Sequence, residues 1–109
     1  MGRRNEVDRL VQEMEHEMRL LGIWSSIPPS AEALASEFPF CYDTLQFDQW
    51  LQWVFLPRIH AVLDAGAALP AASDIAPLAE VWFIEQEMAQ EAARLVGLIR
   101  RFDQVISGQ

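Results

Sequence analysis

The stretch "FDQWLQWVFLPRIHAVLDAG", from Phe47 to Gly66, decides the fold. It has the length of a helix, and Gly66 is a typical stop signal just beyond the last turn. Apolar residues occupy almost every side of this helix when they are placed at about 100° per residue. A helix that is apolar nearly all round is buried, so we expect the other helices to pack against it. The polar strip expected to face water consists of Asp48, Gln49, Gln52 and His60.

Pro57 interrupts this central helix. Proline lacks an N–H and its ring clashes with the carbonyl four residues back, so the helix must kink or change its winding there. By simple periodicity Arg58 falls on the apolar side, where a guanidinium without a carboxylate would be strongly unfavourable. Either the kink turns Arg58 outward or an acid meets it. The candidate acids are Asp43, Asp64 and Glu80. Of these, we predict that Asp43 forms the ion pair.

The segment before the central helix contains a second helical pattern. Apolar residues recur at three- and four-residue spacing, which predicts an amphipathic helix from its N-cap Asn5 to Leu21, with Gly22 as its stop. Its apolar stripe consists of Val7, Leu10, Val11, Met14, Met18 and Leu21. The same stripe could serve a homodimer, which the sequence leaves open.

The connection to the central helix contains two prolines that block a helix interior. Ser30 can cap a short helical turn over residues 31–37. We expect Trp24 and Ile27 to fold back on the core, and Asp43 or Thr44 to cap the central helix.

Residues 78–106 have a helical pattern throughout, with Pro77 suited to the first turn. Residues 85–87 are a candidate break between a short helix and a long last one. The chain of 109 residues is therefore predicted to be a single all-α domain, residues 1–109. Its architecture is an antiparallel helical bundle of four main helices around the proline-kinked central one, or five if the break is real.

Composition excludes several classes of function. No segment has the roughly 20 consecutive apolar residues that a membrane-spanning helix needs. The N-terminus has no apolar region typical of a secretory signal. A single cysteine, Cys41, rules out an internal disulfide and fits a reducing cytoplasm.

The chain has 16 acidic and 8 basic residues, and its net charge is −8. Nucleic-acid affinity depends mainly on Lys and Arg that neutralise phosphates, so this balance argues against direct RNA or DNA binding. A local basic cluster at one end of the bundle remains an alternative, ranked third among the functions. Its members would be Arg3, Arg4, Arg94, Arg100 and Arg101.

Two pairs of residues have types that could support chemistry. Glu13 and His16 have the Glu-x-x-His spacing of di-iron bundles, but no second such motif exists, so we expect a solvated helix face and no metal. Cys41 would need a base such as His60 beside it to act as a nucleophile. Nothing in the sequence requires that pairing, and Cys41 between two aromatic residues is expected to be buried. We expect no cofactor and assign no catalytic residue.

Aromatic residues of the loop "EFPFCYDT" and of the central helix form the candidate interaction patch. Tyr and Trp are favoured at binding hot spots because they bury a large area and keep one polar group. The alternative is that these aromatics simply fill the core, and a half-buried aromatic beside a groove would satisfy both. The patch is assigned to Phe40, Tyr42, Asp43, Gln52, Trp53 and Arg58.

The order and spacing of "PFCYDT", "WLQWV" and "LPR", followed by "LP" at residues 69–70 and "IAP" at residues 75–77, resemble the YqcC-like family of small bacterial proteins. The resemblance extends over roughly residues 7–106. It implies a compact helical bundle with no recognised cofactor or catalytic residue. Members are often encoded beside a tRNA pseudouridine synthase of the C type. That enzyme has a mixed α/β scaffold with a catalytic aspartate, so the resemblance implies a partner and not a reaction.

Together these observations predict a cytoplasmic, non-enzymatic helical-bundle protein that acts through protein–protein contact. The partner implied by the resemblance is a tRNA pseudouridine synthase. The competing prediction is a small-ligand-binding protein or minor enzyme with a pocket near Cys41 and His60.

Overall fold

The computed structural model describes residues 2–108, which form helices and connections and no strand. The elements are α1 (Arg3–Leu20), α2 (Ala31–Leu34), the 3₁₀ helix η1 (Pro39–Cys41), α3 (Phe47–Trp50), the π-helical turn η2 (Leu51–Phe55), α4 (Leu56–Ala65), α5 (Ala76–Glu85) and α6 (Ala93–Ile106). Because α3, η2 and α4 follow one another without interruption, they form one continuous helix. The all-α prediction is confirmed. The break near residues 85–87 is real, so residues 2–108 form five helices when α2 is counted and α3, η2 and α4 are taken as one.

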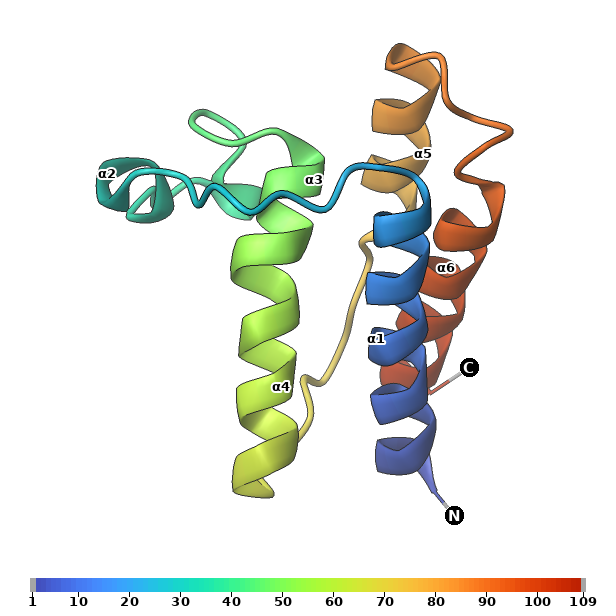
Figure 1. Cartoon of the computed structure of the whole chain (residues 1–109). Coiled ribbons are helices and arrows are strands. Elements are labelled where there is room, and N and C mark those ends of the chain that lie inside the picture. Colours follow the sequence, from blue (N-terminus) through green and yellow to red (C-terminus); the bar gives the residue numbers. More distant parts are fainter. Residues whose placement is uncertain (1, 109) are drawn as a thin grey trace.

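Figure 1 shows how the helices are arranged. Helices α1 and α6 lie side by side and antiparallel, and their contact is the most extensive between any two helices. Helix α5 packs on α6, and α4 packs on α1. Helix α2 projects from the body of the bundle, while both chain ends lie at the opposite end from the connection between α5 and α6. None of the helices in residues 2–108 has both the length and the hydropathy needed to cross a lipid bilayer.

The core is centred on the contact between α1 and α6. All members of the predicted stripe of α1 are buried except Leu21, which is half-buried. They pack against a matching stripe on α6: Leu95, Ile99, Phe102 and Ile106. Burial of such residues is the main stabilising term of a domain of this size.

The continuous helix buries only one side. Leu51, Phe55, Leu56 and Ile59 are buried, whereas Pro57 is exposed. The expectation that this helix is surrounded on all sides is therefore wrong for α4, which lies at the side of the bundle (Figure 1). Within residues 2–108 no further helix covers that outer side.

A wider helical turn resolves the conflict at Pro57. The turn η2 directly precedes α4, whose second residue is Pro57, and the N–H of Leu56 donates to the carbonyl of Leu51, five residues back. Such a turn inserts one residue and rotates everything after it by about 100° relative to a regular helix. Arg58 is thereby turned to solvent. In residues 2–108 no ion pair involves Arg58, so the predicted pair with Asp43 is wrong.

Two predicted helix caps are also wrong. Helix α1 begins at Arg3 with Gly2 at the cap position, not at Asn5. Helix α3 begins at Phe47, where the backbone N–H of Gln46 donates to Oε1 of Gln49 at 2.8 Å. Gln46, and not Asp43 or Thr44, therefore stands at the cap position.

The connection between α1 and α3 follows the predictions in part. The hydroxyl of Ser30 accepts a hydrogen bond from the N–H of Ala33 at 3.1 Å, as predicted, although α2 ends at Leu34. Trp24 is half-buried against the core, as predicted. Ile27 is exposed, so the prediction that it folds back on the core is wrong.

Helices α1, α4 and α5 end in the same way. After α1 and α4, Gly22 and Gly66 adopt the left-handed conformation, with φ of 76° and 64°. After α5, the equivalent residue is Glu87, with φ of 58°. Its N–H donates to Ile84, and the N–H of the half-buried Met88 donates to Phe83, which completes a Schellman motif. Glu87 therefore occupies a backbone conformation that favours glycine.

Replacing Glu87 with glycine should stabilise the fold. Relief of the left-handed strain exceeds the extra backbone entropy of glycine, so we expect Glu87→Gly to raise the free energy of unfolding by about 0.5–1 kcal/mol. Denaturant unfolding would measure this change. The converse control is Gly22→Ala, where an added Cβ meets nothing within 4 Å and only the backbone term changes. It should lower the free energy of unfolding by about 1 kcal/mol.

A carboxylate on α6 fixes the start of α5. Asp103 is buried and accepts hydrogen bonds from the N–H groups of Ile75 at 2.9 Å and Ala76 at 2.8 Å, and from the hydroxyl of Ser73 at 2.6 Å. These N–H groups are at the N-terminus of α5, where the helix itself has no carbonyl four residues back to accept them. Asp103 therefore caps a helix that begins 27 residues earlier.

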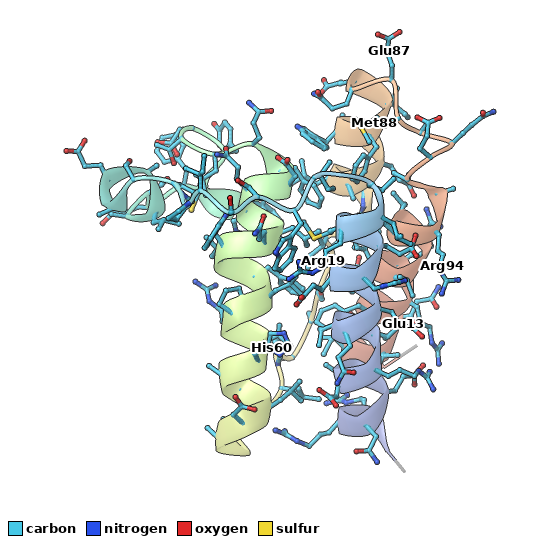
Figure 2. The ribbon with its side chains drawn as sticks, in the orientation of Figure 1. Glu13, Arg19, His60, Glu87, Met88 and Arg94 are labelled. Carbon is cyan, nitrogen blue, oxygen red and sulfur yellow. The ribbon has the colours of Figure 1, made fainter. Side chains whose placement is uncertain are left out.

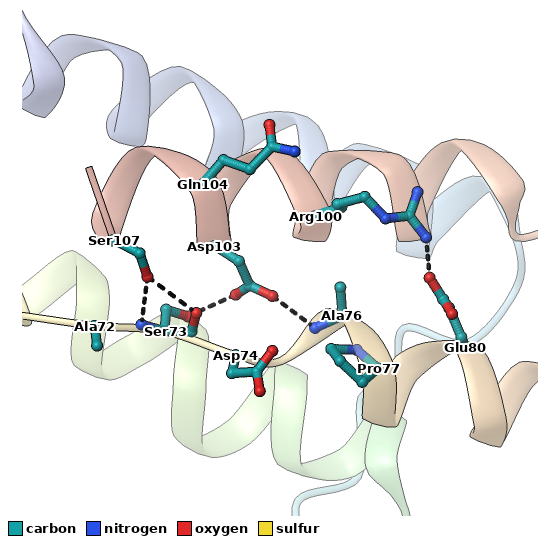
Figure 3. A pocket seen from close by; sticks show the side chains of 10 residues that line it. All are labelled: Ala72, Ser73, Asp74, Ala76, Pro77, Glu80, Arg100, Asp103, Gln104 and Ser107. Atoms are coloured by element: carbon teal, nitrogen blue, oxygen red, sulfur yellow. Dashed lines mark hydrogen bonds and ion pairs between the residues drawn. The ribbon is translucent and has the colours of Figure 1, made fainter. Parts of the chain in front are cut away.

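Asp103 borders a cavity of about 580 Å³ between α6 and the segment before α5 (Figure 3). The hydroxyl of Ser107 accepts from the N–H of Ser73 at 3.2 Å, and Arg100 is paired with Glu80 at the opposite side of the cavity. The polar groups that border this cavity form hydrogen bonds and an ion pair with one another, which indicates a structural role.

Removing the Asp103 carboxylate should destabilise the fold strongly. Asp103→Ala leaves two buried N–H groups without an acceptor, and we expect a loss of about 2–3 kcal/mol in the free energy of unfolding. Asp74→Ala is the matched control, because Asp74 is an exposed acid in the same segment. Its effect should stay within about 0.5 kcal/mol. Equal losses in chemical denaturation of the two variants would contradict the role given to Asp103.

Candidate functional site

The loop before α3 contains two strained residues. Phe40 and Cys41 are consecutive and both have positive φ, at 58° and 50°. This conformation is unfavourable by about 1–2 kcal/mol for each residue that is not glycine. The N–H of Leu45 donates to the carbonyl of Cys41 at 2.8 Å, and the ring of Phe40 packs edge-on against Trp50 with 4.7 Å between centroids. These contacts hold the loop in a shape that it would not adopt alone.

The strained turn presents an aromatic pair to solvent. Phe38 and Tyr42 flank it, and their side chains are 51% and 68% exposed. Their ring centroids lie 5.4 Å apart. Two neighbouring aromatic rings at this exposure offer a contact area typical of binding hot spots.

A groove of about 160 Å³ separates this loop from α5. It is lined by Phe40, Tyr42, Leu45, Gln46, Phe47, Leu78 and Trp82. The indole N–H of Trp82 donates to Oε1 of Gln46 at 3.1 Å and so fixes the two walls to each other. The second wall, from α5, is absent from the patch predicted from the sequence.

Helix α5 carries apolar residues on both of its sides. Ala79 and Phe83 are buried on the inner side. On the outer side Val81 is 54% exposed and Ile84 is 63% exposed. A second groove of about 410 Å³ runs along the other edge of α5, and Ile84 lines it. The near-continuous apolar run in residues 81–84 is the signal that could have revealed this helix as a binding element.

We group residues of this loop and of α5 under one name, the α5 surface. Its loop and its helix share the groove between Tyr42 and Trp82, and the exposed residues of α5 continue from there along the helix. The α5 surface consists of Phe38, Tyr42, Leu78, Val81, Trp82 and Ile84.

The structure places only some residues of the predicted interaction patch at the groove. Phe40 and Tyr42 line the groove, and the exposed Asp43 follows Tyr42 and accepts a hydrogen bond from the Ser36 hydroxyl at 2.5 Å. Trp53 is half-buried and Arg58 is exposed, both on the continuous helix. Neither of these two residues lines the groove.

Gln52 is buried and has a structural role. Its side chain is 4% exposed, so the prediction that it faces water is wrong. Its amide accepts from the N–H of Ser25 at 2.9 Å and donates to the carbonyl of the same residue at 2.7 Å. Gln52 thereby attaches the connection after α1 to the continuous helix.

The structure does not bring Cys41 and His60 together. Cys41 is buried in η1, directly before the continuous helix. His60 is half-buried well along α4 (Figure 2). His60 is thirteen positions after Phe47 along the continuous helix, which corresponds to roughly 20 Å along the axis. The pocket near both residues that the competing prediction requires is therefore contradicted by their placement.

The remaining candidates lie on helix faces. Glu13 is half-buried and His16 is exposed on α1. Within residues 2–108 there is no group of three or more His, Cys, Asp or Glu side chains placed to hold a metal ion.

The arginines of the alternative basic cluster are mostly engaged. Arg94 pairs with Glu17 at 3.1 Å, and Arg100 pairs with Glu80. Arg101 pairs with Glu6 at 2.7 Å, and its hydrogen bond lowers the pKa of that carboxyl. Arg4 donates to the carbonyls of Val62 and Ala67, and so ties the start of α1 to the end of α4. These contacts reduce the charge that could meet a phosphate backbone.

Comparison with known proteins gives consistent matches. The family described as "DUF446: tRNA pseudouridine synthase C" matches residues 6–105. An uncharacterized protein of Haemophilus influenzae is 41% identical over 96 residues, which cover 87% of this chain and 91% of that protein. The solution NMR structure of protein YqcC from E. coli has a TM-score of 0.83 at 28% identity, with 98% of this chain and 90% of that chain covered.

One further relative is much longer than this chain. A protein of Pectobacterium carotovorum subsp. carotovorum named tRNA pseudouridine synthase C is 46% identical over 70 residues. Those residues cover 64% of this chain but only 19% of that relative. Since the family match extends over residues 6–105 and the fold is that of YqcC, this chain belongs to the DUF446, or YqcC-like, family.

Proposed function

We propose that this chain is a cytoplasmic, non-enzymatic interaction protein that acts as an accessory factor to tRNA pseudouridine synthase C. The α5 surface carries the proposal, because Tyr42 of the loop shares a groove with Leu78 and Trp82 of α5, and the same helix exposes Val81 and Ile84. Larger apolar patches of this kind mark interaction sites in proteins that are otherwise well packed.

The geometry supports binding better than it supports a reaction. Catalysis by a nucleophile needs that group and a base within hydrogen-bond reach. Cys41 and His60, the candidate pair for this role, lie on separate elements, and Cys41 is buried. The exposed residues of the α5 surface are instead those that supply affinity in protein interfaces.

The choice of partner is supported by the long relative from Pectobacterium carotovorum. The segment similar to this chain is 19% of that protein, which is named tRNA pseudouridine synthase C. Joining two parts in one polypeptide keeps them at a high effective concentration, which is useful when the parts act together. The same association between separate chains would require a binding surface of the kind that α5 presents.

Charge is consistent with this partner. An enzyme that binds tRNA needs cationic side chains to neutralise phosphates. This chain has a net charge of −8 and is suited to approach such a protein. Complementary charge accelerates association and suppresses wrong orientations.

Substitution of Tyr42 tests the proposal. We expect Tyr42→Ala to weaken binding to the purified tRNA pseudouridine synthase C of the same organism by about tenfold or more, as loss of an aromatic hot spot does. Calorimetric titration would measure the dissociation constant. Because Tyr42 is 68% exposed, the melting temperature should be nearly unchanged.

The matched control is Leu20→Ala. Leu20 is an apolar residue of α1 with the same exposed fraction, 68%, and lies outside the α5 surface. It should leave the dissociation constant unchanged within about twofold. If the wild-type chain fails to bind the enzyme at micromolar concentrations, the proposed function is wrong.

A further inference from the structure

Charge is unevenly distributed along the chain. Residues 20–57 contain four acidic residues and residues 59–93 contain six, and neither segment contains an arginine or a lysine. These two segments supply every residue of the α5 surface. The arginines lie instead in the first 19 residues, at position 58 and from residue 94 onward. The segments that expose apolar residues are therefore also the strongly negative ones.

Three carboxylates border the outer end of α5. Glu85, Glu87 and Glu91 are exposed, and no ion pair in residues 2–108 involves any of them. Figure 2 shows Glu87 extending from the end of the molecule beyond α5. We call these three residues the acidic rim. Arg100, which lines the neighbouring groove, is already paired with Glu80. The charge of the acidic rim is thus available to a partner.

The backbone conformation gives an independent indication that the groove and the acidic rim are functional. In residues 2–108 the non-glycine residues with positive φ are Phe40, Cys41 and Glu87. Phe40 lines the groove of the α5 surface, and Glu87 belongs to the acidic rim. Equivalent helix ends use Gly22 and Gly66, so folding alone would favour glycine at position 87 as well. Strain that is retained in this way is typical of functional positions.

We infer that the α5 surface binds a cationic protein segment that also carries apolar side chains. The apolar side chains would cover Val81, Trp82 and Ile84, and arginines or lysines of the partner would meet the acidic rim. This inference rests on the proposed function, because a tRNA-binding enzyme presents cationic surface. The apolar centre supplies affinity, and the charged rim sets the association rate and the orientation.

A second copy of this chain fits the surface less well. In a symmetric pair, where the same patch faces itself, each acidic rim would meet a surface drawn from segments that contain no arginine or lysine. Like charges placed opposite each other are unfavourable. The charge of the α5 surface therefore favours a basic partner over self-association.

The test compares two triple variants of equal charge. Glu85→Gln, Glu87→Gln and Glu91→Gln together neutralise the acidic rim. Asp8→Asn, Glu32→Gln and Asp64→Asn together remove the same charge from exposed positions on α1, α2 and α4. The probe is the full-length tRNA pseudouridine synthase C of the same organism, and binding kinetics are measured over a range of salt concentrations.

We expect the rim variant to bind about tenfold more weakly at low salt, mainly through slower association, and to lose much of the salt dependence. The control variant should remain within about twofold of wild type. A third variant, Ile84→Asp, should weaken binding by about thirtyfold through faster dissociation, as loss of a central anchor does. Because Ile84 is exposed, this variant should stay folded, and its circular dichroism melt would verify this.

The outcomes separate the two proposals. If wild type binds and both the rim variant and Ile84→Asp bind equally well, the inference is overturned while the proposed function stands. If wild type does not bind at all, both fall. If sedimentation shows that wild type self-associates and that Ile84→Asp abolishes only this, the occupant is a second copy, and the inference is again overturned.

Discussion

The carboxylate of Asp103 is the contact on which the arrangement of this protein depends. It joins α6 to the first N–H groups of α5 and to Ser73, so it fixes where α5 begins and how it lies on α6. Helix α5 is apolar on both sides, and its own sequence does not select the side to bury. With its start fixed, Ala79 and Phe83 face the core, and Val81 and Ile84 face outward. The exposed side of α5, which is the helical part of the surface proposed for binding, follows from this attachment.

Local strain and exposed apolar area coincide in this fold. The backbone is in a left-handed conformation at Phe40, at Cys41 and at Glu87, and contacts formed elsewhere compensate for it. The ring of Phe40 packs on Trp50, and Met88 follows Glu87 back onto the core. Natural sequences usually agree with their fold at every level, and disagreements concentrate at functional sites. The family relationship adds that this chain and YqcC share the fold at 28% identity.

Much of the architecture could be predicted because it depends on residues only three or four positions apart. The stripe of α1, the stops at Gly22 and Gly66 and the cap at Ser30 all follow from neighbouring residues. The all-α class follows from the same periodicity. In the candidate site, Phe40 and Tyr42 could be identified because an aromatic side chain in a loop either packs on the core or offers contact area to a partner.

The sequence by itself thus determined the helices, several of their ends and the acidic character of the chain. Only the tertiary structure decided the partners of its polar groups and the exposed side of α5. The turn η2 rotates Arg58 to solvent, Gln52 binds Ser25 27 residues away, and Asp103 caps a helix 27 residues earlier. The last two contacts join residues far apart in the chain, so no local period encodes them. They are settled when packing brings a donor and an acceptor within reach, because a buried polar group must then find a partner.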